Sequence, residues 1–198
     1  YFKELISIGI KIIPNSSKTE SELLDFNKEY SLNLSFITEN GSSIHGLNLI
    51  HKNLPEKISI SRPVEKIYEI FNKNISYDLK QKIKFVSKLD EQEQKRIFGL
   101  PLNKIKLALE RKYSIPIQFN GSEEEKNELT KTINDAGLTV QTGGRIINIC
   151  DKVNKSVAIV KTLELISNEI KNEIITIGVG DNQNDIDMLK KADYSCLV

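Results

Sequence analysis

The sequence predicts an α/β protein with a doubly wound, Rossmann-like core of parallel strands and an inserted α+β cap domain. The core is predicted by three apolar runs, Ile10–Ile13, Leu32–Thr38 and Ile174–Val179, which each stop at turn-forming or acidic residues. Stretches with helical periodicity separate these runs. A strand–helix–strand order implies that the strands pair in parallel.

The cap is predicted by a change of composition between the second and third apolar runs. Over this part the chain becomes rich in Lys and Glu, and helical patterns mix with short strand patterns. We therefore expect residues 1–56 and 151–198 to form the core and residues 57–150 to form the cap.

The first core elements follow from caps and turns. Tyr1–Ile8 is typical of the last turns of a helix that ends at Gly9. After the strand Ile10–Ile13, Ser17 and Glu20 have the spacing of a capping box and predict the start of a second helix. The second strand then ends at an Asn-Gly turn, Asn40-Gly41.

Within the cap, helical periodicity alternates with short β-rich runs. We expect helices over Val64–Phe71, Leu89–Phe98, Leu102–Tyr113 and Glu123–Ala136, a strand over Ile115–Phe119, and a hairpin over Leu138–Ile149. After the cap, a helix begins at Asn154-Lys155 and leads to the strand Ile174–Val179, which we expect to be buried.

Composition excludes several classes of protein. The 28 basic and 27 acidic side chains nearly balance, so we expect neither a nucleic-acid partner nor a membrane surface. No apolar run is long enough to span a membrane, and no signal peptide is visible. Cys150 and Cys196 lie in apolar stretches without CxxC spacing, so we expect buried free thiols and a cytoplasmic protein.

The acids at the end of the third run predict a metal site. Asp181 follows an extended apolar run and Asp185 lies four residues later, so both belong at the carboxyl edge of the sheet, where α/β folds bind ligands. Carboxylates suit Mg²⁺, which usually keeps water and substrate phosphate in its remaining positions. The alternative is that Asp181 or Asn184 only caps the following helix.

Three further polar side chains follow predicted strands or open a core helix. Ser16 can hold a phosphate oxygen, Lys155 can neutralise phosphate charge, and Asn40 lies at the end of the neighbouring strand. Each has a structural alternative: Ser16 as a turn or cap residue, Lys155 as a solvated lysine, and Asn40 as a turn former. Their shared position at strand ends favours a phosphate site.

These residues resemble the motifs of the haloacid dehalogenase superfamily of Mg²⁺-dependent phosphohydrolases. Ser16 resembles its second motif, Lys155 its third, and Gly180–Asp185 its fourth, while residues 57–150 resemble the cap of the Cof-type branch. The lysine lies in Asn154-Lys155-Ser156, where the superfamily usually has Asp-Lys-Gly.

Within the superfamily the chain is most similar to the mannosyl-3-phosphoglycerate phosphatases. The similar strings are Ile13-Pro14-Asn15-Ser16-Ser17-Lys18-Thr19, Thr38-Glu39-Asn40-Gly41, Arg111-Lys112-Tyr113-Ser114-Ile115-Pro116 and Gly143-Gly144-Arg145. The resemblance implies that Ser16 and Lys155 hold the transferring phosphoryl group and that Asp181 and Asp185 hold Mg²⁺. It also implies a substrate-binding set of Lys18, Asn40, Arg111, Gly143, Gly144 and Arg145. For Arg111 a surface ion pair stays an equal alternative.

The implied reaction removes phosphate from mannosyl-3-phosphoglycerate and gives a compatible solute. The first motif of the superfamily, D-x-D, supplies the nucleophile that forms a phosphoaspartate, and no such motif precedes the second motif in this sequence. We therefore expect the 198 residues alone to be inactive. The alternatives are a glucosyl-3-phosphoglycerate phosphatase, another sugar-phosphate phosphatase, or a non-catalytic phosphate-binding regulatory protein.

Overall fold

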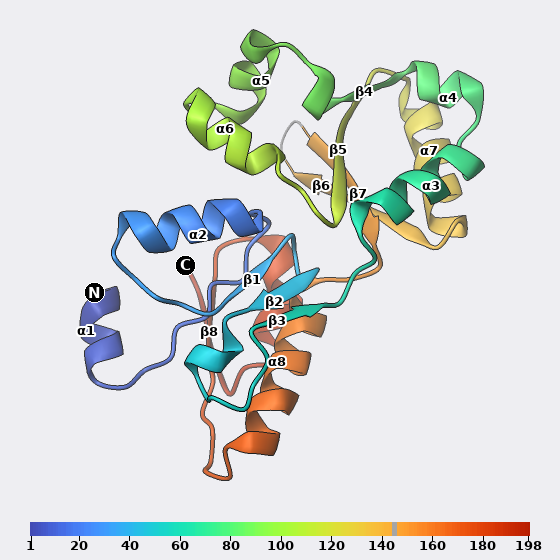
Figure 1. Cartoon of the computed structure of the whole chain (residues 1–198). Helices are drawn as coiled ribbons and strands as arrows, with labels where there is room; N and C mark the ends of the chain where they lie inside the picture. The colour runs from blue at the N-terminus through green and yellow to red at the C-terminus, as the bar shows by residue number, and fades with distance from the viewer. Residues whose placement is uncertain (144–145) are drawn as a thin grey trace. The chain divides into compact units, whose positions relative to one another are not determined.

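The computed structural model describes residues 1–143 and 146–198, and the chain divides into two compact units. Unit 1 comprises Tyr1–Lys18, Leu23–Ile60 and Val153–Val198, and unit 2 comprises Thr19–Glu22 and Ser61–Lys152 (Figure 1). The chain therefore passes from unit 1 to unit 2 and back twice. Each unit has its own hydrophobic core.

The first predicted strand is wrong. Helix α1 spans Phe2–Ser7 and is followed by Gly9 in the left-handed region, as expected, but residues 10–13 form no strand. Pairing begins only at Asn15, which makes a parallel bridge with Ile37. Among the described residues, no strand pairs with residues 10–13. The segment Phe36–Thr38 contacts Asn15 through Ile37 and then forms a hairpin with Ser43–His45.

Unit 1 contains a small antiparallel sheet in the order β1-β2-β3, with β1 over Phe36–Thr38, β2 over Ser43–His45 and β3 over Lys57–Ser59. Strand β1 is shorter than predicted, because the carboxamide of Asn27 hydrogen-bonds both backbone groups of Leu34 and so replaces a strand partner. The sequence patterns did not predict β2, β3 or the 3₁₀ turn η1 (Leu47–Leu49).

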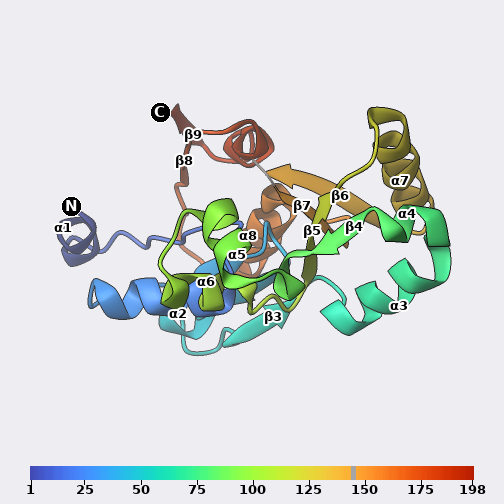
Figure 2. The same ribbon diagram turned by 90° about the horizontal axis from the view of Figure 1, so that it is seen from above.

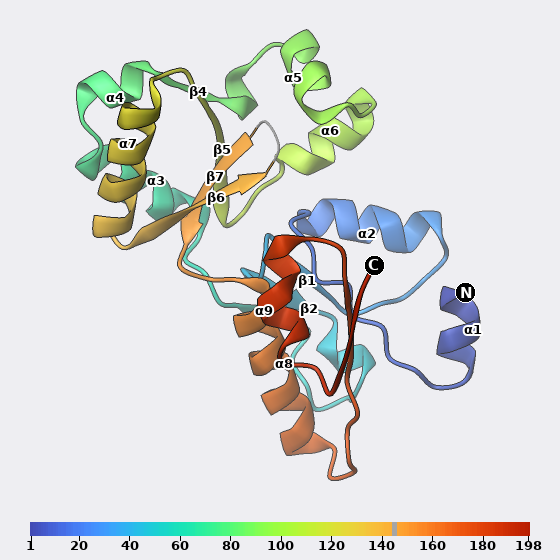
Figure 3. The ribbon, with the colours of Figure 1, turned by 180° about the vertical axis from the view of Figure 1, so that it is seen from behind.

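Helix α8, Lys155–Glu169, packs against this sheet (Figures 1 and 3). Asn154 caps its first turn by accepting a 2.9 Å hydrogen bond from the amide of Val157, which confirms the predicted start. The side chains buried between helix and sheet are apolar: Ile37, Ile44, Leu47, Leu54, Ala158 and Ile166.

The third apolar run forms a parallel strand, but the expectation that it is buried is wrong. Strand β8 (Ile177–Gly180) pairs in parallel with β9 (Tyr194–Leu197), and Figure 2 shows the two side by side near the C-terminus. Helix α9 (Ile186–Leu189) lies beside α8 in Figure 3 and contacts β8 on the face of Gly178. The opposite face stays open, so Ile177 and Val179 are 69% and 58% exposed.

The two cysteines differ in burial. Cys150 is a buried free thiol, as expected, but Cys196 is exposed. Cys196 pairs with Val179 across β8 and β9, and therefore lies on the same open face of this two-stranded sheet.

Helix α2, Glu20–Glu29, starts in unit 2 and continues in unit 1. Its capping box lies two residues later than predicted. The amide of Thr19 donates to the Glu22 carboxylate at 2.8 Å, and the amide of Glu22 donates to the Thr19 hydroxyl at 3.2 Å. Thr19, not Ser17, is therefore the residue at which the helix begins.

Unit 2 is built on an antiparallel sheet in the order β4-β5-β7-β6. Figures 1 and 3 show α3, α4 and α7 on one side of this sheet and α5 and α6 on the other. The elements of this unit are α3 Val64–Asn74, α4 Tyr77–Gln81, β4 Ile83–Phe85, η2 Val86–Lys88, α5 Glu91–Phe98, α6 Leu102–Leu109, β5 Ser114–Phe119, α7 Glu123–Asp135, β6 Leu138–Gly143 and β7 Ile146–Asp151.

The cap elements predicted from periodicity are confirmed, although α6 ends at Leu109 instead of Tyr113, and α4, β4 and η2 were missed. Helices α3 and α7 bury their apolar sides against the sheet, with Phe71, Leu129 and Ile133 nearly inaccessible to solvent. Within the described ranges 1–143 and 146–198, no helix has both the length and the apolar character that a membrane crossing requires.

Candidate functional site

The segment that carries Ser16 lies against the turn after β1. The amide of Ile37 donates to the Pro14 carbonyl at 2.8 Å, and the amide of Ser16 donates to the Ile37 carbonyl at 3.0 Å. The contact continues beyond the strand, because the amide of Asn40 donates to the Ser16 carbonyl at 2.9 Å. The backbone therefore fixes the predicted residues Ser16 and Asn40 side by side.

Lys18 belongs to the same contact. Its amide donates to the Ser16 hydroxyl at 3.3 Å, and its carbonyl accepts from the amide of Glu39 at 2.9 Å. Glu39 and Asn40 both have positive φ angles, 44° and 58°. Two such residues in a row are uncommon, and backbone strain of this kind concentrates at functional sites.

Gly41 brings this turn against the start of α8. Its φ is 103°, and a Cβ at this position would overlap the carbonyl oxygen of Asn154. Only glycine allows the turn to approach the helix so closely. The turn that carries Asn40 therefore lies beside the helix end that carries Lys155.

Asn15 links the Ser16 segment to the two other segments of the site. Its Nδ2 donates to the main-chain carbonyl of Lys155 at 3.0 Å and contacts the sulfur of Met188 at 3.5 Å. Met188 lies in α9, directly after the acidic loop. Three parts of the chain that are far apart in sequence thus meet at one side chain.

Lys155 and Asp185 form a buried ion pair. Their Nζ and Oδ1 atoms are 2.5 Å apart, and the side chains are only 11% and 5% exposed. Burial by itself would raise the pKa of the Asp185 carboxyl, but the hydrogen bond and charge of Lys155, with two backbone amides, outweigh it and hold this pKa below its usual range.

The acidic loop folds around Asp185. The second carboxylate oxygen of Asp185 accepts hydrogen bonds from the amides of Asp181 and Asn182, at 3.2 and 3.1 Å. Gly180 permits this geometry, since a Cβ there would lie 2.5 Å from the Cβ of Asp185. Asp181 itself is exposed, and one of its oxygens accepts from the Asn182 carboxamide at 2.7 Å.

The two carboxylates of the acidic loop differ in how well they suit the expected Mg²⁺ ion. Asp181 offers an exposed carboxylate of the hard oxygen type that Mg²⁺ prefers, so its chemistry fits a Mg²⁺ site that is completed by water and substrate. Both oxygens of Asp185 are already hydrogen-bonded. Within the described part of the chain, no three His, Cys, Asp or Glu side chains gather in a cluster that could hold a metal.

The network combines groups that suit a phosphoryl ligand. Ser16 offers a hydroxyl, and the Lys155 ammonium has three N–H donors, of which Asp185 needs one. Asp181 directly follows β8, and its amide donates to the second oxygen of Asp185. Ser16, Asn40, Lys155, Asp181 and Asp185 are therefore joined through contacts within unit 1.

The remaining predicted residues lie in unit 2 or outside the described residues. Arg111 follows α6 and donates from its guanidinium to the Ser114 hydroxyl at 3.2 Å. Gly143 ends β6, where it pairs with Ile146 of β7. Gly144 and Arg145 lie outside the described residues.

The sequence patterns missed two polar features. Asn15 lies in one of the strings that resemble the phosphatases, but no role was predicted for it. The second is a buried chain of side chains on β1 and β2, in which Ser43 contacts both Thr38 and His45 at 2.7 Å. Alternation within a strand would have placed Ser43 and His45 on one face, but β2 itself was not predicted.

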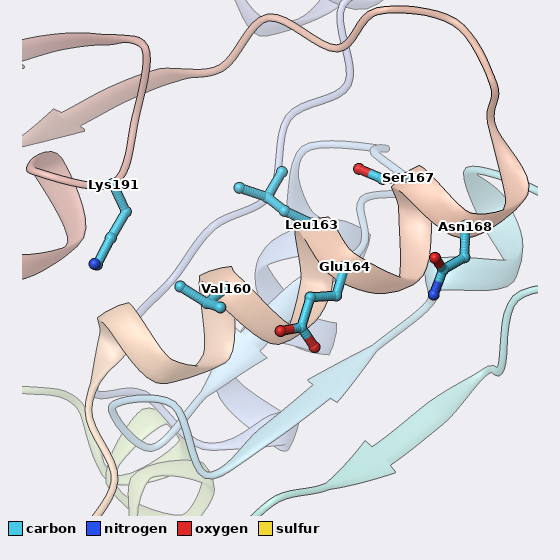
Figure 4. A pocket seen from close by; sticks show the side chains of 6 residues that line it. All are labelled: Val160, Leu163, Glu164, Ser167, Asn168 and Lys191. Atoms are coloured by element: carbon cyan, nitrogen blue, oxygen red, sulfur yellow. The ribbon is translucent and has the colours of Figure 1, made fainter.

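A shallow hollow beside α8 contains none of the predicted site residues (Figure 4). Its lining residues are Val160, Leu163, Glu164, Ser167, Asn168 and Lys191. All but Lys191 come from α8, and the hollow offers neither the hydroxyl nor the buried ion pair of the Ser16 network.

The sequence of the chain is similar to those of known hydrolases over nearly its whole length. The profile described as haloacid dehalogenase-like hydrolase matches residues 1–198. The mannosyl-3-phosphoglycerate phosphatase of Pyrococcus horikoshii is 31% identical over 206 residues, which cover 99% of this chain and 80% of that protein. The glucosyl-3-phosphoglycerate/mannosyl-3-phosphoglycerate phosphatase of Persephonella marina is 27% identical over 199 residues, which cover 96% of this chain and 72% of that protein.

A solved structure shows the same fold. The haloacid dehalogenase-like hydrolase from B. subtilis has a TM-score of 0.63 and 13% sequence identity, with 98% of this chain and 79% of that chain covered. The predicted fold class and the resemblance drawn from the sequence motifs are confirmed.

Proposed function

Because the chain belongs to the haloacid dehalogenase-like hydrolases, we propose that it forms the phosphate site and cap of a Mg²⁺-dependent phosphatase. The proposed substrate is a glycosyl-3-phosphoglycerate, with mannosyl-3-phosphoglycerate first and the glucosyl form second. The products are inorganic phosphate and a glycosylglycerate, a compatible solute.

The observation that carries the proposal is the continuous network from Ser16 to Asp181. It joins a hydroxyl, an ammonium and an exposed carboxylate across three separate chain segments. In phosphoryl transfer the protein mainly positions the phosphoryl group and stabilises its charge. Ser16, Lys155 and the Asp181 loop are suited to position a phosphoryl group and to stabilise its charge.

In the proposed reaction the Ser16 hydroxyl donates a hydrogen bond to one phosphoryl oxygen. Lys155 donates hydrogen bonds from the N–H groups that do not bond Asp185. Asp185 directs the Lys155 ammonium by accepting a hydrogen bond from it. Asp181 would hold Mg²⁺, which when bound supplies positive charge beside the phosphoryl oxygens. Arg111, Gly143, Gly144 and Arg145 are proposed to bind the glycerate carboxylate or the sugar, because a guanidinium can bond both oxygens of a carboxylate.

The choice of substrate rests on the relatives. The two curated proteins described above are named for mannosyl- and glucosyl-3-phosphoglycerate. The strings around Ser16, Arg111 and Arg145 resemble those of the mannosyl enzymes, which favours the mannosyl substrate.

The reaction also needs a nucleophile. Asp185 is buried with both oxygens hydrogen-bonded, and Asp181 is the proposed metal carboxylate, so neither is suited to attack phosphorus. We therefore propose that a carboxylate outside this network attacks and forms the phosphoaspartate.

The test is phosphate release by the protein that carries this chain, measured with mannosyl- and glucosyl-3-phosphoglycerate and with a small phosphate ester, in excess Mg²⁺ and in excess chelator. We expect hydrolysis only with the metal, and a loss of about 100-fold or more in kcat for Asp181→Asn. The matched control is Asp187→Asn, which alters an exposed acid on α9 that pairs only loosely with Lys190, at 3.8 Å. Full activity of Asp181→Asn in chelator would overturn the metal role, and hydrolysis of the small ester alone would overturn the substrate.

A further inference from the structure

We infer that Asn15 is a positioning residue, which aligns Ser16 with Lys155 through its side-chain carboxamide. The inference deepens the proposed function and rests on it, since it concerns how the same phosphate site is assembled. Asn15 itself is not assigned a contact with phosphate.

The first argument is the pair of donor contacts. The Asn15 Nδ2 lies 3.0 Å from the carbonyl oxygen of Lys155 and 3.5 Å from the sulfur of Met188. Lys155 is 140 residues away along the chain and Met188 is 173 residues away. One amide group therefore joins the first residue of α8 to the helix that follows Asp185.

The second argument is the orientation of this amide. The Asn15 Oδ1 is buried and has no hydrogen-bond partner among the described residues. Rotating the amide by half a turn would place Oδ1 against the Lys155 carbonyl, so that two acceptors would face each other. The donor contacts thus fix the orientation, and they are kept although a buried acceptor without a partner is costly.

The third argument is that hydrogen bonds hold the backbone on both sides of Asn15. Residues on both sides of it hydrogen-bond Ile37 in a parallel bridge, and Ser16 is the next residue along the chain. A shift of Lys155 relative to Asn15 is therefore also a shift relative to Ser16. Lys155 and Asp185 hold each other, but their ion pair does not reach Ser16.

The consequence concerns phosphate binding. If Ser16 and Lys155 contact the same phosphoryl group, both must be correctly placed at once, and small misplacements cost large factors. We expect Asn15→Leu, which keeps a similar shape without a donor, to weaken the affinity for inorganic phosphate about tenfold. Asn15→Ser, which keeps a shorter donor, should give an intermediate affinity.

The experiment is calorimetric titration of inorganic phosphate into the chain and its variants, with thermal unfolding measured in parallel. The matched control is Asn27→Ala, which removes another carboxamide that bonds main-chain groups, those of Leu34, away from the site. Asn27→Ala should lower the unfolding temperature without changing phosphate affinity. A double-mutant cycle with Ser16→Ala adds a second readout, because an aligning residue should matter less once the Ser16 hydroxyl is gone.

Each outcome is decisive. Phosphate affinity of Asn15→Leu equal to that of the unmodified chain, or full additivity with Ser16→Ala, overturns the positioning role. If Asn15→Leu does not fold, the same comparison is made with Asn15→Ser and Asn15→Ala, and equal affinities of these two overturn the inference. If the unmodified chain and Asn27→Ala bind no phosphate at all, the proposed function fails first and the inference falls with it.

Discussion

The ammonium of Lys155 and the carboxylate of Asp185 are both buried. If either side chain is removed, the charge of the other stays buried without a partner. A buried ion pair adds little net stability over apolar residues of the same shape, but removing one partner leaves an uncompensated charge. The pair is therefore expected to be retained for its chemistry, since it presents an ammonium beside the acidic loop.

Lys155→Met should lower the free energy of unfolding at pH 7 by about 3 kcal/mol, because Asp185 remains buried without its partner. Lys161→Met is the control on the same helix, since its exposed pair with Glu164 spans 3.6 Å, and we expect no measurable change there. Denaturant unfolding of both variants checks this. Equal effects would mean that the Lys155–Asp185 pair is no more important than a surface contact.

The cost of Lys155→Met should depend on pH in a defined direction. The native pKa of Asp185 is lowered, so the stability it contributes is present above the unfolded pKa and is lost as the pH falls through the native pKa. In Lys155→Met that carboxyl loses its main stabilising partner and its pKa rises. The stability difference between the unmodified chain and Lys155→Met should therefore narrow between pH 7 and pH 4, and a constant difference would contradict the buried-charge explanation.

Single residues also show how far sequence analysis reaches. Ser16, Asn40, Lys155 and the acidic loop were predicted to lie together because each follows a strand pattern or opens a helix, and the structure joins them. Asn15 was not predicted, because its role depends on contacts with residues 140 and 173 positions away. No local pattern encodes such distances.

The turn between β1 and β2 is the element that brings the Ser16 segment to α8. Gly41→Ala should cost about 2 kcal/mol more than Gly99→Ala, because both have positive φ but only Gly41 faces a backbone carbonyl. The midpoint of chemical denaturation measures both costs. Similar midpoints for the two variants would show that the turn can move away from Asn154.

Among the elements, those with regular periodicity were predicted well and those that depend on partners were not. Helices α3 and α7 each bury an apolar side, and the caps Ser122 and Asn154 mark the starts of α7 and α8, so local sequence suffices. The run Ile10–Ile13 has the composition of a strand, but a strand exists only where a neighbour offers hydrogen bonds. For the same reason β2 and β3 were missed, since each is three residues long and is defined by pairing.

The molecule as a whole exposes an apolar surface on β8 and β9. Ile177, Val179 and Tyr194 are all more than half exposed and lie on the sheet face opposite α9. Exposed strand faces of this kind promote association between chains.

The double variant Ile177→Thr, Val179→Thr should raise the concentration at which the 198-residue chain stays monodisperse in light scattering. Its unfolding temperature should change little, because the replaced side chains contribute little to the core. The control Val157→Thr, Val160→Thr replaces two side chains on α8 that are 46% and 37% exposed, and should not alter association. Unchanged aggregation of the β8 variant would show that this face is not the cause.

The central claim is that the Ser16–Lys155–Asp181 network binds a phosphoryl group together with Mg²⁺. The most direct measurement is the affinity of the chain for inorganic phosphate with and without Mg²⁺, by calorimetry, for the unmodified chain, Asp181→Asn and the control Asp187→Asn. We expect Mg²⁺ to strengthen phosphate binding in the unmodified chain and in Asp187→Asn, and to have no effect in Asp181→Asn. A phosphate affinity that changes neither with Mg²⁺ nor with the Asp181 substitution would contradict the account.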